Sequence, residues 1–379
     1  MKRKVLLVAL SDALSATTEK GEYTPLYYNP GNFFDEVHFI ATNQDTPNLQ
    51  AMQCTVGDAD LHFHNLPLPP YKKTLGHHRL FLGEWVRQGV ALAEKAKPSL
   101  IRVYGNSYNG YLASQIKKSL RLPLVVSLHT HSDENRGYMP WKQWFISQYS
   151  LWREKETLRA ADWVLPVYDS ICGYAQKRGA RKVQVCYNIL DGGNLRKKES
   201  YQLHSPPRIL CVGRQIDGKK PDNIVRAVAR TSAELTLVGD GPHHLLLRRI
   251  AEELQIEDRV HFYPAIANNE LCAMLPDFDI FAFQMDYWGI AKSVMEPMLT
   301  GLPIVHSLRN GPIGIELQNE GVVLIENTEE AYYRALTRLL EDHAERERVG
   351  RAAHQYAHER FSPEKAEEAY LEIYRSLLS

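Results

Sequence analysis

The order of apolar runs along the chain is the feature that most constrains its fold. Short runs rich in β-branched and aromatic residues alternate with longer stretches of helical periodicity, a pattern typical of parallel α/β layers. In the first half, strands are expected at 4–10, 36–40, 100–104, 124–129, 163–167 and 183–187, and helices at 80–97, 108–121 and 140–160. The strands are almost continuously hydrophobic, which predicts burial on both faces.

The pattern stops at 190–207, a polar stretch with Gly-Gly, Pro-Pro and a basic cluster, and then begins again. The second series of expected strands covers 208–213, 235–239, 259–263, 279–283, 303–306 and 322–325. A chain of 379 residues is too long for one typical core. We therefore predict an α/β protein of two doubly wound Rossmann-like domains, residues 1–190 and 208–360, which face a cleft and are joined by a linker at 191–207.

Composition narrows the class of protein. A content of 44% hydrophobic and 24% charged residues is typical of a soluble globular protein, and no window reaches the roughly 18 apolar residues of a membrane-spanning helix. The apolar run near the N-terminus ends at Ser11-Asp12, which favours a first strand over a signal peptide. Five cysteines without a C-x-x-C pair indicate reduced thiols and a cytoplasmic setting.

Charge is unevenly distributed along the chain. Residues 1–195 hold 23 Lys and Arg against 17 Asp and Glu, although the whole chain is neutral. This surplus is compatible with an anionic acceptor or with peripheral contact at the inner membrane face, and equally with chance placement on solvated surfaces. No patch of basic and aromatic residues suggests nucleic-acid binding.

Ligands of open parallel sheets collect beyond the carboxyl ends of the strands. The expected strand 208–213 is followed by Arg214, Lys219 and Lys220, just before a helix that opens near Asp222. An Arg and a Lys five residues apart at a strand-to-helix turn can converge on a diphosphate. The alternative is a solvated basic turn. The later turn Gly239–Pro242 lacks the third glycine of a dinucleotide fingerprint, because His244 stands there.

One carboxylate lies inside an apolar run, GIAKSVMEPMLTGLPIV at 289–305. Gly289 lets the backbone approach a ligand, and Lys292 and Ser293 begin a helix whose first N–H groups suit an anion. Glu296 lies about one turn into this helix. An ionised acceptor that binds two vicinal hydroxyls would explain a carboxylate at such a position.

Together these segments resemble the nucleotide-binding half of a family 4 glycosyltransferase with the GT-B fold. The resemblance rests on Val212-Gly213-Arg214 with Lys219, on Val238–Pro242, on Val260-His261-Phe262, and on Ser293–Met298 closing at Gly301–Val305. It is specific across 208–305 and looser elsewhere. It implies a retaining, metal-independent transferase without a cofactor, and a C-terminal helix, residues 361–379, that packs back on the first domain.

The resemblance also implies roles for individual residues. Arg214 and Lys219 would hold the donor diphosphate as catalytic cations, Glu296 would bind the ribose, and backbone near Ile266 would face the base. Amides at Lys292 and Ser293 would add to the phosphate site. In the first domain, His129 at a strand end would contact the sugar or the acceptor.

Two departures from the family pattern affect the donor site. The first acid of the E-x7-E segment falls at Trp288, so Asp286 is a candidate replacement; otherwise Trp288 offers a stacking face. The Gly-Gly loop after the first strand is also absent, and Gly21 is the candidate for close approach to the donor.

Metal binding is not expected. His62-Phe63-His64 and His129-Thr130-His131 place two imidazoles on one face of a strand, but two ligands do not make a zinc site and no adjacent Cys or acid completes either pair.

These observations favour transfer of a sugar from a nucleoside-diphosphate sugar to a hydroxyl of a glycan, a lipid-linked acceptor or a small molecule. Two alternatives stay open. A nucleotide-sugar epimerase of the same fold would consume the donor without an acceptor, and a non-catalytic partner subunit would keep only the nucleotide pocket.

Overall fold

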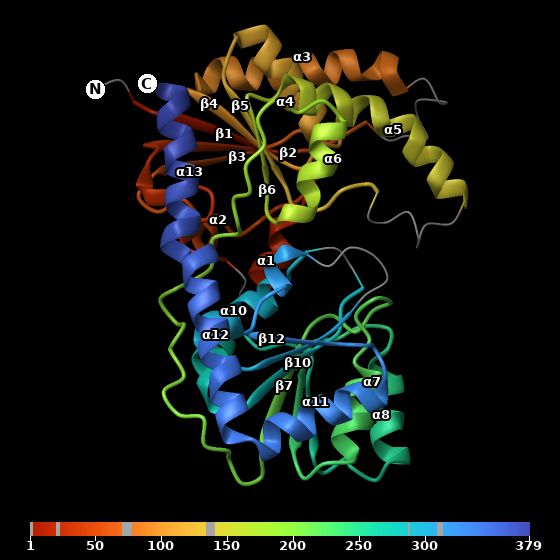
Figure 1. Ribbon diagram of the computed structural model, residues 1–379. Coiled ribbons are helices and arrows are strands. Elements are labelled where there is room, and N and C mark those ends of the chain that lie inside the picture. Colours follow the sequence, from red (N-terminus) through yellow and green to blue (C-terminus); the bar gives the residue numbers. More distant parts are fainter. Residues whose placement is uncertain (1–2, 20–22, 70–77, 134–140, 287–288, 309–313) are drawn as a thin grey trace. The chain divides into compact units, whose positions relative to one another are not determined.

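The computed structural model describes residues 3–19, 23–69, 78–133, 141–286, 289–308 and 314–379. Two compact units divide the chain: residues 1–189 together with 366–379, and residues 190–365. Figure 1 shows a sheet flanked by helices in each unit. Within the described residues, no helix has both the length and the apolar character needed to cross a bilayer.

The first unit contains a six-stranded parallel sheet in the order β3-β2-β1-β4-β5-β6. Its strands are β1 Val5–Leu10, β2 Glu36–Ala41, β3 Asp60–Asn65, β4 Leu100–Tyr104, β5 Leu124–Leu128 and β6 Trp163–Pro166. The helices of the unit are α1 Leu14–Glu19, α2 Leu49–Met52, α3 His78–Ala96, α4 Tyr108–Leu120, α5 Trp141–Ala160 and α6 Cys172–Lys177.

The second unit contains another six-stranded parallel sheet, in the order β12-β11-β10-β7-β8-β9. Its strands are β7 Arg208–Val212, β8 Glu234–Val238, β9 Val260–Tyr263, β10 Ile280–Phe283, β11 Ile304–Ser307 and β12 Val322–Ile325. The helices are α7 Asp222–Ala229, α8 His244–Glu253, α9 Asn268–Met274, α10 Lys292–Thr300, α11 Glu329–Glu341 and α12 His343–Phe361. Helix α11 packs against α7, and α12 packs against α10. The two parallel α/β sheets expected from the sequence are confirmed.

Two expected features of the first half differ from the structure. Residues 183–187 run beside β6 but do not form a regular strand. Val183 bridges to Val164, and the N–H groups of Gln184 and Cys186 donate to the Val164 and Pro166 oxygens at 3.1 and 2.9 Å. The sixth strand of the sheet is instead β3, which pairs with β2 in parallel register. Its residues are half-buried or exposed, so β3 lacks the continuous apolar run by which the other strands are recognised in the sequence.

The C-terminal helix α13, Pro363–Leu378, contributes its residues from Ala366 onward to the first unit. Tyr370 and Tyr374 are fully buried there among apolar side chains that include Phe34. The Tyr374 hydroxyl accepts a hydrogen bond from Arg102 Nη1 at 2.8 Å, and Arg102 lies 4.3 Å from the Tyr370 ring centroid. A buried guanidinium is therefore held by tyrosines of the last helix.

The segment that joins the two series of strands is packed on the second unit. Lys198 is buried and its Nζ donates to the carbonyl oxygens of Pro276 and Phe278 at 2.8 and 2.7 Å. The Tyr201 hydroxyl donates to the Gly301 oxygen at 3.0 Å. Residues 191–207, which we expected to be a linker, are therefore part of the compact second unit.

Candidate functional site

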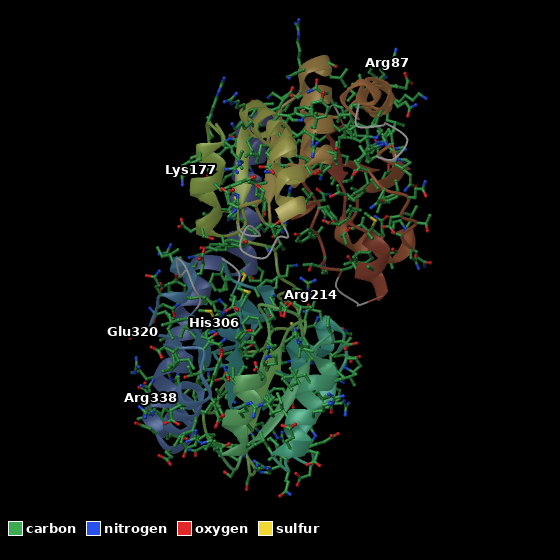
Figure 2. The ribbon with its side chains drawn as sticks, turned by 90° about the vertical axis from the view of Figure 1, so that its right-hand side faces the viewer. Arg87, Lys177, Arg214, His306, Glu320 and Arg338 are labelled. Carbon is green, nitrogen blue, oxygen red and sulfur yellow. The ribbon has the colours of Figure 1, made fainter. Side chains whose placement is uncertain are left out.

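Most of the predicted donor residues lie in loops that follow β7, β9 and β10 or in the first half of α10. These strands run parallel in one sheet, so their carboxyl ends open on the same edge, where ligands of such sheets bind. Figure 2 marks the side chain of Arg214, which belongs to the first of these loops.

The loop after β7 carries the basic residues and is tied to the end of β10. The Lys220 N–H donates to the Gln284 side-chain oxygen at 2.5 Å, and the Asp286 N–H donates to the Gly218 oxygen at 2.8 Å. The Lys219 ammonium lies 5.8 Å from the Phe283 ring centroid. Arg214 is exposed, and within the described part of the chain its guanidinium has no hydrogen bond or ion pair. It is therefore available to an anionic ligand.

A glycine turn brings the ends of β7 and β8 into backbone contact. Gly239 has a φ of 133°, and a Cβ atom at this position would lie 2.1 Å from the Gly213 oxygen. The buried Gln215 closes the turn, because its N–H donates to the Asp240 oxygen at 2.9 Å and its side-chain amide to the Gly239 oxygen at 2.8 Å. The turn fixes the backbone immediately after Arg214.

Glu296 lies in the buried part of α10. The residue is only 5% exposed, and its Oε1 accepts a hydrogen bond from the Asn268 side-chain amide at 3.0 Å. Asn268 is the first residue of α9, and half-buried Ile266 lies two residues before it. Asn268 was missed by sequence reasoning, because no spacing pattern links it to a residue 28 positions away.

Helix α10 begins after Ala291, which gives it no side-chain cap. Ala291 is extended and offers no side-chain hydrogen bond, and Lys292 and Ser293 form the first, half-buried turn. The preceding Gly289 is buried and has a φ of 112°, a conformation that favours glycine. The helix ends at Gly301, which is left-handed with a φ of 94°. Such an N-terminus offers partial positive charge to a phosphate.

A second carboxylate, Glu316, lies fully buried in the short helix η7, Ile315–Leu317. A Cβ atom at Gly314 would lie 2.7 Å from Glu316 Oε2 and 3.9 Å from the Gly289 Cα. The Glu316 carboxylate therefore lies beside the backbone that leads into α10. Sequence reasoning missed it, although an acid within the apolar run GIEL is the same signal that identified Glu296.

The first unit places His129 directly after β5. The residue is half-buried, its ring centroid lies 5.6 Å from that of Tyr104, and its backbone oxygen accepts from the Tyr168 hydroxyl at 3.1 Å. Gly21 and Trp288, the other predicted donor contacts, lie outside the described residues.

A polar network follows His129 in the chain and was also missed. Arg178 donates to both Asp133 oxygens at 3.2 and 2.9 Å and to Glu154 Oε2 at 3.1 Å. The Tyr174 hydroxyl donates to the same Glu154 oxygen at 2.6 Å. The His131 ring stacks on Tyr174 with centroids 4.8 Å apart. Burial lowers the pKa of His131 to about 4, so this imidazole is neutral at pH 7.

Comparison with known proteins matches both halves of the chain. The family described as "Glycosyl transferases group 1" covers residues 195–356, and "Glycosyltransferase Family 4" covers residues 35–191. The lipopolysaccharide core biosynthesis glycosyltransferase LpsE of Rhizobium meliloti is 25% identical over 52% of this chain and 58% of its own length. The N-acetyl-alpha-D-glucosaminyl L-malate synthase of Bacillus anthracis is 23% identical over 90% of both chains.

The fold is also similar to that of solved structures. The Anabaena protein HepE, crystallised in complex with UDP, superposes with a TM-score of 0.76 at 18% identity, over 99% of this chain and 100% of HepE. At this identity the likeness establishes the fold. The family models account for both units, and the motifs at the carboxyl edge of the second sheet agree with them: the chain belongs to the family 4 glycosyltransferases of the GT-B fold.

Proposed function

We propose that this protein transfers a sugar, with retention at the anomeric carbon, from a nucleoside-diphosphate sugar to an acceptor hydroxyl during assembly of a glycan or glycolipid. The bond between the anomeric carbon and the diphosphate breaks, a bond to the acceptor oxygen forms, and the acceptor proton passes to the departing diphosphate. The names of the relatives support this class: LpsE acts in lipopolysaccharide core biosynthesis, and HepE was crystallised with UDP.

The observation that carries the proposal is the buried carboxylate of Glu296 at the carboxyl edge of the second sheet. A buried charge is costly unless it is hydrogen-bonded. Asn268 occupies Oε1, and a ribose diol would supply two further O–H donors to the carboxylate. Hydrogen bonds to an ionised acceptor are stronger than those between neutral groups, so this side chain is suited to holding the nucleoside.

The departing diphosphate needs positive charge that is already in place. Arg214 is exposed on the loop after β7, Lys219 and Lys220 follow on the same loop, and the N-terminus of α10 adds its peptide dipoles. Preorganised charges of this kind stabilise the charge that develops on the leaving group without reorganisation. We assign Arg214 and Lys219 to the diphosphate and Asp286 or Trp288 to the transferred sugar.

The first unit is proposed to serve the acceptor. His129 follows β5 at the carboxyl edge of the first sheet, where a half-buried imidazole can hydrogen-bond a sugar or acceptor hydroxyl. Gly21 stays assigned to close approach of the donor on the basis of the family pattern.

The proposal is tested by thermal unfolding of the full chain with UDP, GDP, ADP, CDP and dTDP. A nucleotide at 100 times its dissociation constant should stabilise the protein by about 2.7 kcal/mol, and Glu296→Gln should weaken that binding by about tenfold or more through loss of a charged hydrogen bond. Glu270→Gln is the matched control, since Glu270 lies on α9 near Asn268 but is exposed.

The outcomes separate the competing functions. Stabilisation by one nucleotide that Glu296→Gln reduces and Glu270→Gln leaves unchanged supports the donor pocket. Sugar transfer to an acceptor then distinguishes a transferase from an epimerase, which would form a new sugar isomer without any acceptor. If no nucleotide stabilises the folded protein, the donor pocket is refuted.

A further inference from the structure

Three histidines and a carboxylate gather on one face of β2 and β3 in the first unit. The strands pair in parallel with His38 opposite His62, Glu36 opposite Asp60, and Ile40 opposite His64. Alternate residues of a strand share a face, so Glu36 and His38 project beside His62 and His64. The residues of the opposite face, among them Val37 and Phe39, pack into the apolar core.

The imidazoles of His38 and His62 converge on one carboxylate oxygen. Glu36 Oε1 lies 2.7 Å from His38 Nε2 and 3.2 Å from His62 Nε2, and the three candidate ligand atoms lie within 4.8 Å of one another. In a tetrahedral zinc site with metal–ligand bonds of about 2.1 Å, ligand atoms are roughly 3.4 Å apart. Small side-chain rotations would therefore admit a metal ion between the three groups.

The surrounding side chains have the arrangement that supports metal ligands. His38 Nδ1, the ring nitrogen not directed at Glu36, lies 3.1 Å from His64 Nε2. A metal-bound histidine usually donates its second N–H to such an acceptor, which fixes the ring. Arg3 Nη1 lies 3.5 Å from Glu36 Oε2, and Arg3 also pairs with Asp60. One Glu36 oxygen is thus oriented by Arg3 while the other faces the histidines.

One of the two histidines is buried and the other is open to solvent, an arrangement that lets an ion reach the site. His38 is buried, whereas the His62 side chain is 44% exposed, so an ion can enter from solvent.

We propose that Glu36, His38 and His62 bind a Zn²⁺ ion, with a water molecule as fourth ligand, and that the ion ties the edge strand β3 to β2. Imidazole and carboxylate are established zinc ligands, and two histidines with one glutamate leave one position open. Edge strands expose unpaired backbone groups, and cross-linking β3 to its neighbour would hold this edge in register. The sequence led us to expect no metal at His62-Phe63-His64, because no adjacent acid completes that pair. In the structure, β2 supplies both the acid, Glu36, and a second imidazole, His38.

The test is zinc titration of untagged, chelator-treated full-length protein in competition with a chromophoric chelator. Wild type should bind one equivalent with a dissociation constant below about 1 µM. His62→Ala and Glu36→Gln each remove a metal ligand and should weaken zinc binding by about 100-fold or more. His64→Ala removes only a residue that hydrogen-bonds a ligand and should weaken zinc binding by about 10–100-fold. Substitution by Co²⁺ should give the visible absorption of tetrahedral coordination.

His261→Ala is the matched control, because His261 lies on β9 with Nε2 3.6 Å from Glu234 and is similarly exposed, but no second histidine completes its pair among the described residues. It should leave zinc affinity unchanged. Amide exchange in β3 should slow when Zn²⁺ is added to wild type and should not change when it is added to His62→Ala. Because His62 is exposed, its replacement is not expected to unfold the protein and so mimic the loss of the site.

Failure of wild type to bind zinc below about 1 µM, or equal affinity in wild type and His62→Ala, would overturn the proposal. Loss of the site in His261→Ala would do the same. Nucleotide binding by the second unit reports on the proposed function separately, since none of the three ligands belongs to that unit.

Discussion

The two units of the chain have sheets of the same strand order but hold different polar groups. Read from its β9 edge, the second sheet runs β9-β8-β7-β10-β11-β12, which repeats the order β3-β2-β1-β4-β5-β6 of the first. After β5, the first unit carries side chains paired with one another, such as Arg178 with Asp133 and Glu154. The second carries glycine turns closed by backbone contacts and an exposed arginine after β7. One topology thus supports two surfaces, because chemistry resides in the loops.

The same difference holds for buried charge. Arg102 of the first unit is enclosed by Ser127 and Tyr374, which it contacts at 3.1 and 2.8 Å, and by the Tyr104 and Tyr370 rings. This arrangement stabilises the docking of α13. Glu296 of the second unit lies instead at the edge where the strands end, close to loops that can admit a ligand. A buried charge thus has a structural role in one unit and a proposed binding role in the other.

The largest expected effect follows from removing the exposed charge of the second unit. Arg214→Ala should lower turnover by roughly 100-fold or more, in the range measured when one preorganised donor is lost. Steady-state sugar transfer checks this, with Arg226→Ala on α7 as control. Near-normal turnover in Arg214→Ala would mean that the loop after β7 is not the diphosphate site.

Replacing a glycine by alanine should have opposite effects on stability at Gly239 of the second unit, which is in close backbone contact, and at Gly173 of the first unit, which is not. Gly239→Ala should destabilise the second unit by about 3 kcal/mol, because its Cβ would strike the Gly213 oxygen and overpacking costs about 1–3 kcal/mol or more. Gly173→Ala in α6, which has no atom within 4 Å of an added Cβ, should stabilise by about 0.5 kcal/mol. Urea unfolding of both variants measures the pair, and equal effects would contradict the close approach of β7 and β8.

Acid should affect the first unit through His131. Its folded pKa of about 4 lies below the unfolded value of about 6.5, so its contribution is present above pH 6.5 and is lost as the pH falls toward 4. Between pH 7 and pH 5 this loss amounts to about 2 kcal/mol. His131→Phe, which keeps a ring against Tyr174, should remove that part of the pH dependence.

Amide exchange should place the acid-dependent loss in the first unit. If wild type and His131→Phe lose stability equally between pH 7 and pH 5, this imidazole is not the cause.

The last comparison is between two buried tyrosine hydroxyls, one in each unit. Tyr374→Phe removes one of the two side-chain hydrogen-bond acceptors of the Arg102 guanidinium and should cost about 1.5–2 kcal/mol, because bonds to charged groups contribute more. Tyr332→Phe removes a bond to the Phe283 oxygen, 2.8 Å long, and should cost about 1 kcal/mol. Chemical unfolding of the two variants measures both losses of stability. A larger loss in Tyr332→Phe would contradict the greater contribution assigned to the Tyr374 hydrogen bond with Arg102.

The sequence by itself determined the parallel α/β class, eleven of the twelve strands in outline, and the loops on which the donor residues lie. It could do so because strands buried on both faces are marked locally by continuous apolar runs, and because residues following those strands must lie at one edge of the sheet. Glu296 was found for the same local reason, as a charge among apolar neighbours.

Only the tertiary structure decided which distant residues meet. It pairs Asn268 with Glu296, places Glu316 beside the Gly314 turn, and joins Glu36 and His38 to His62 across two strands. It also replaces the expected strand at 183–187 by β3. Local periodicity reports how deeply a segment is buried, whereas strand register and side-chain convergence depend on pairing between segments far apart in the chain, which no local pattern records.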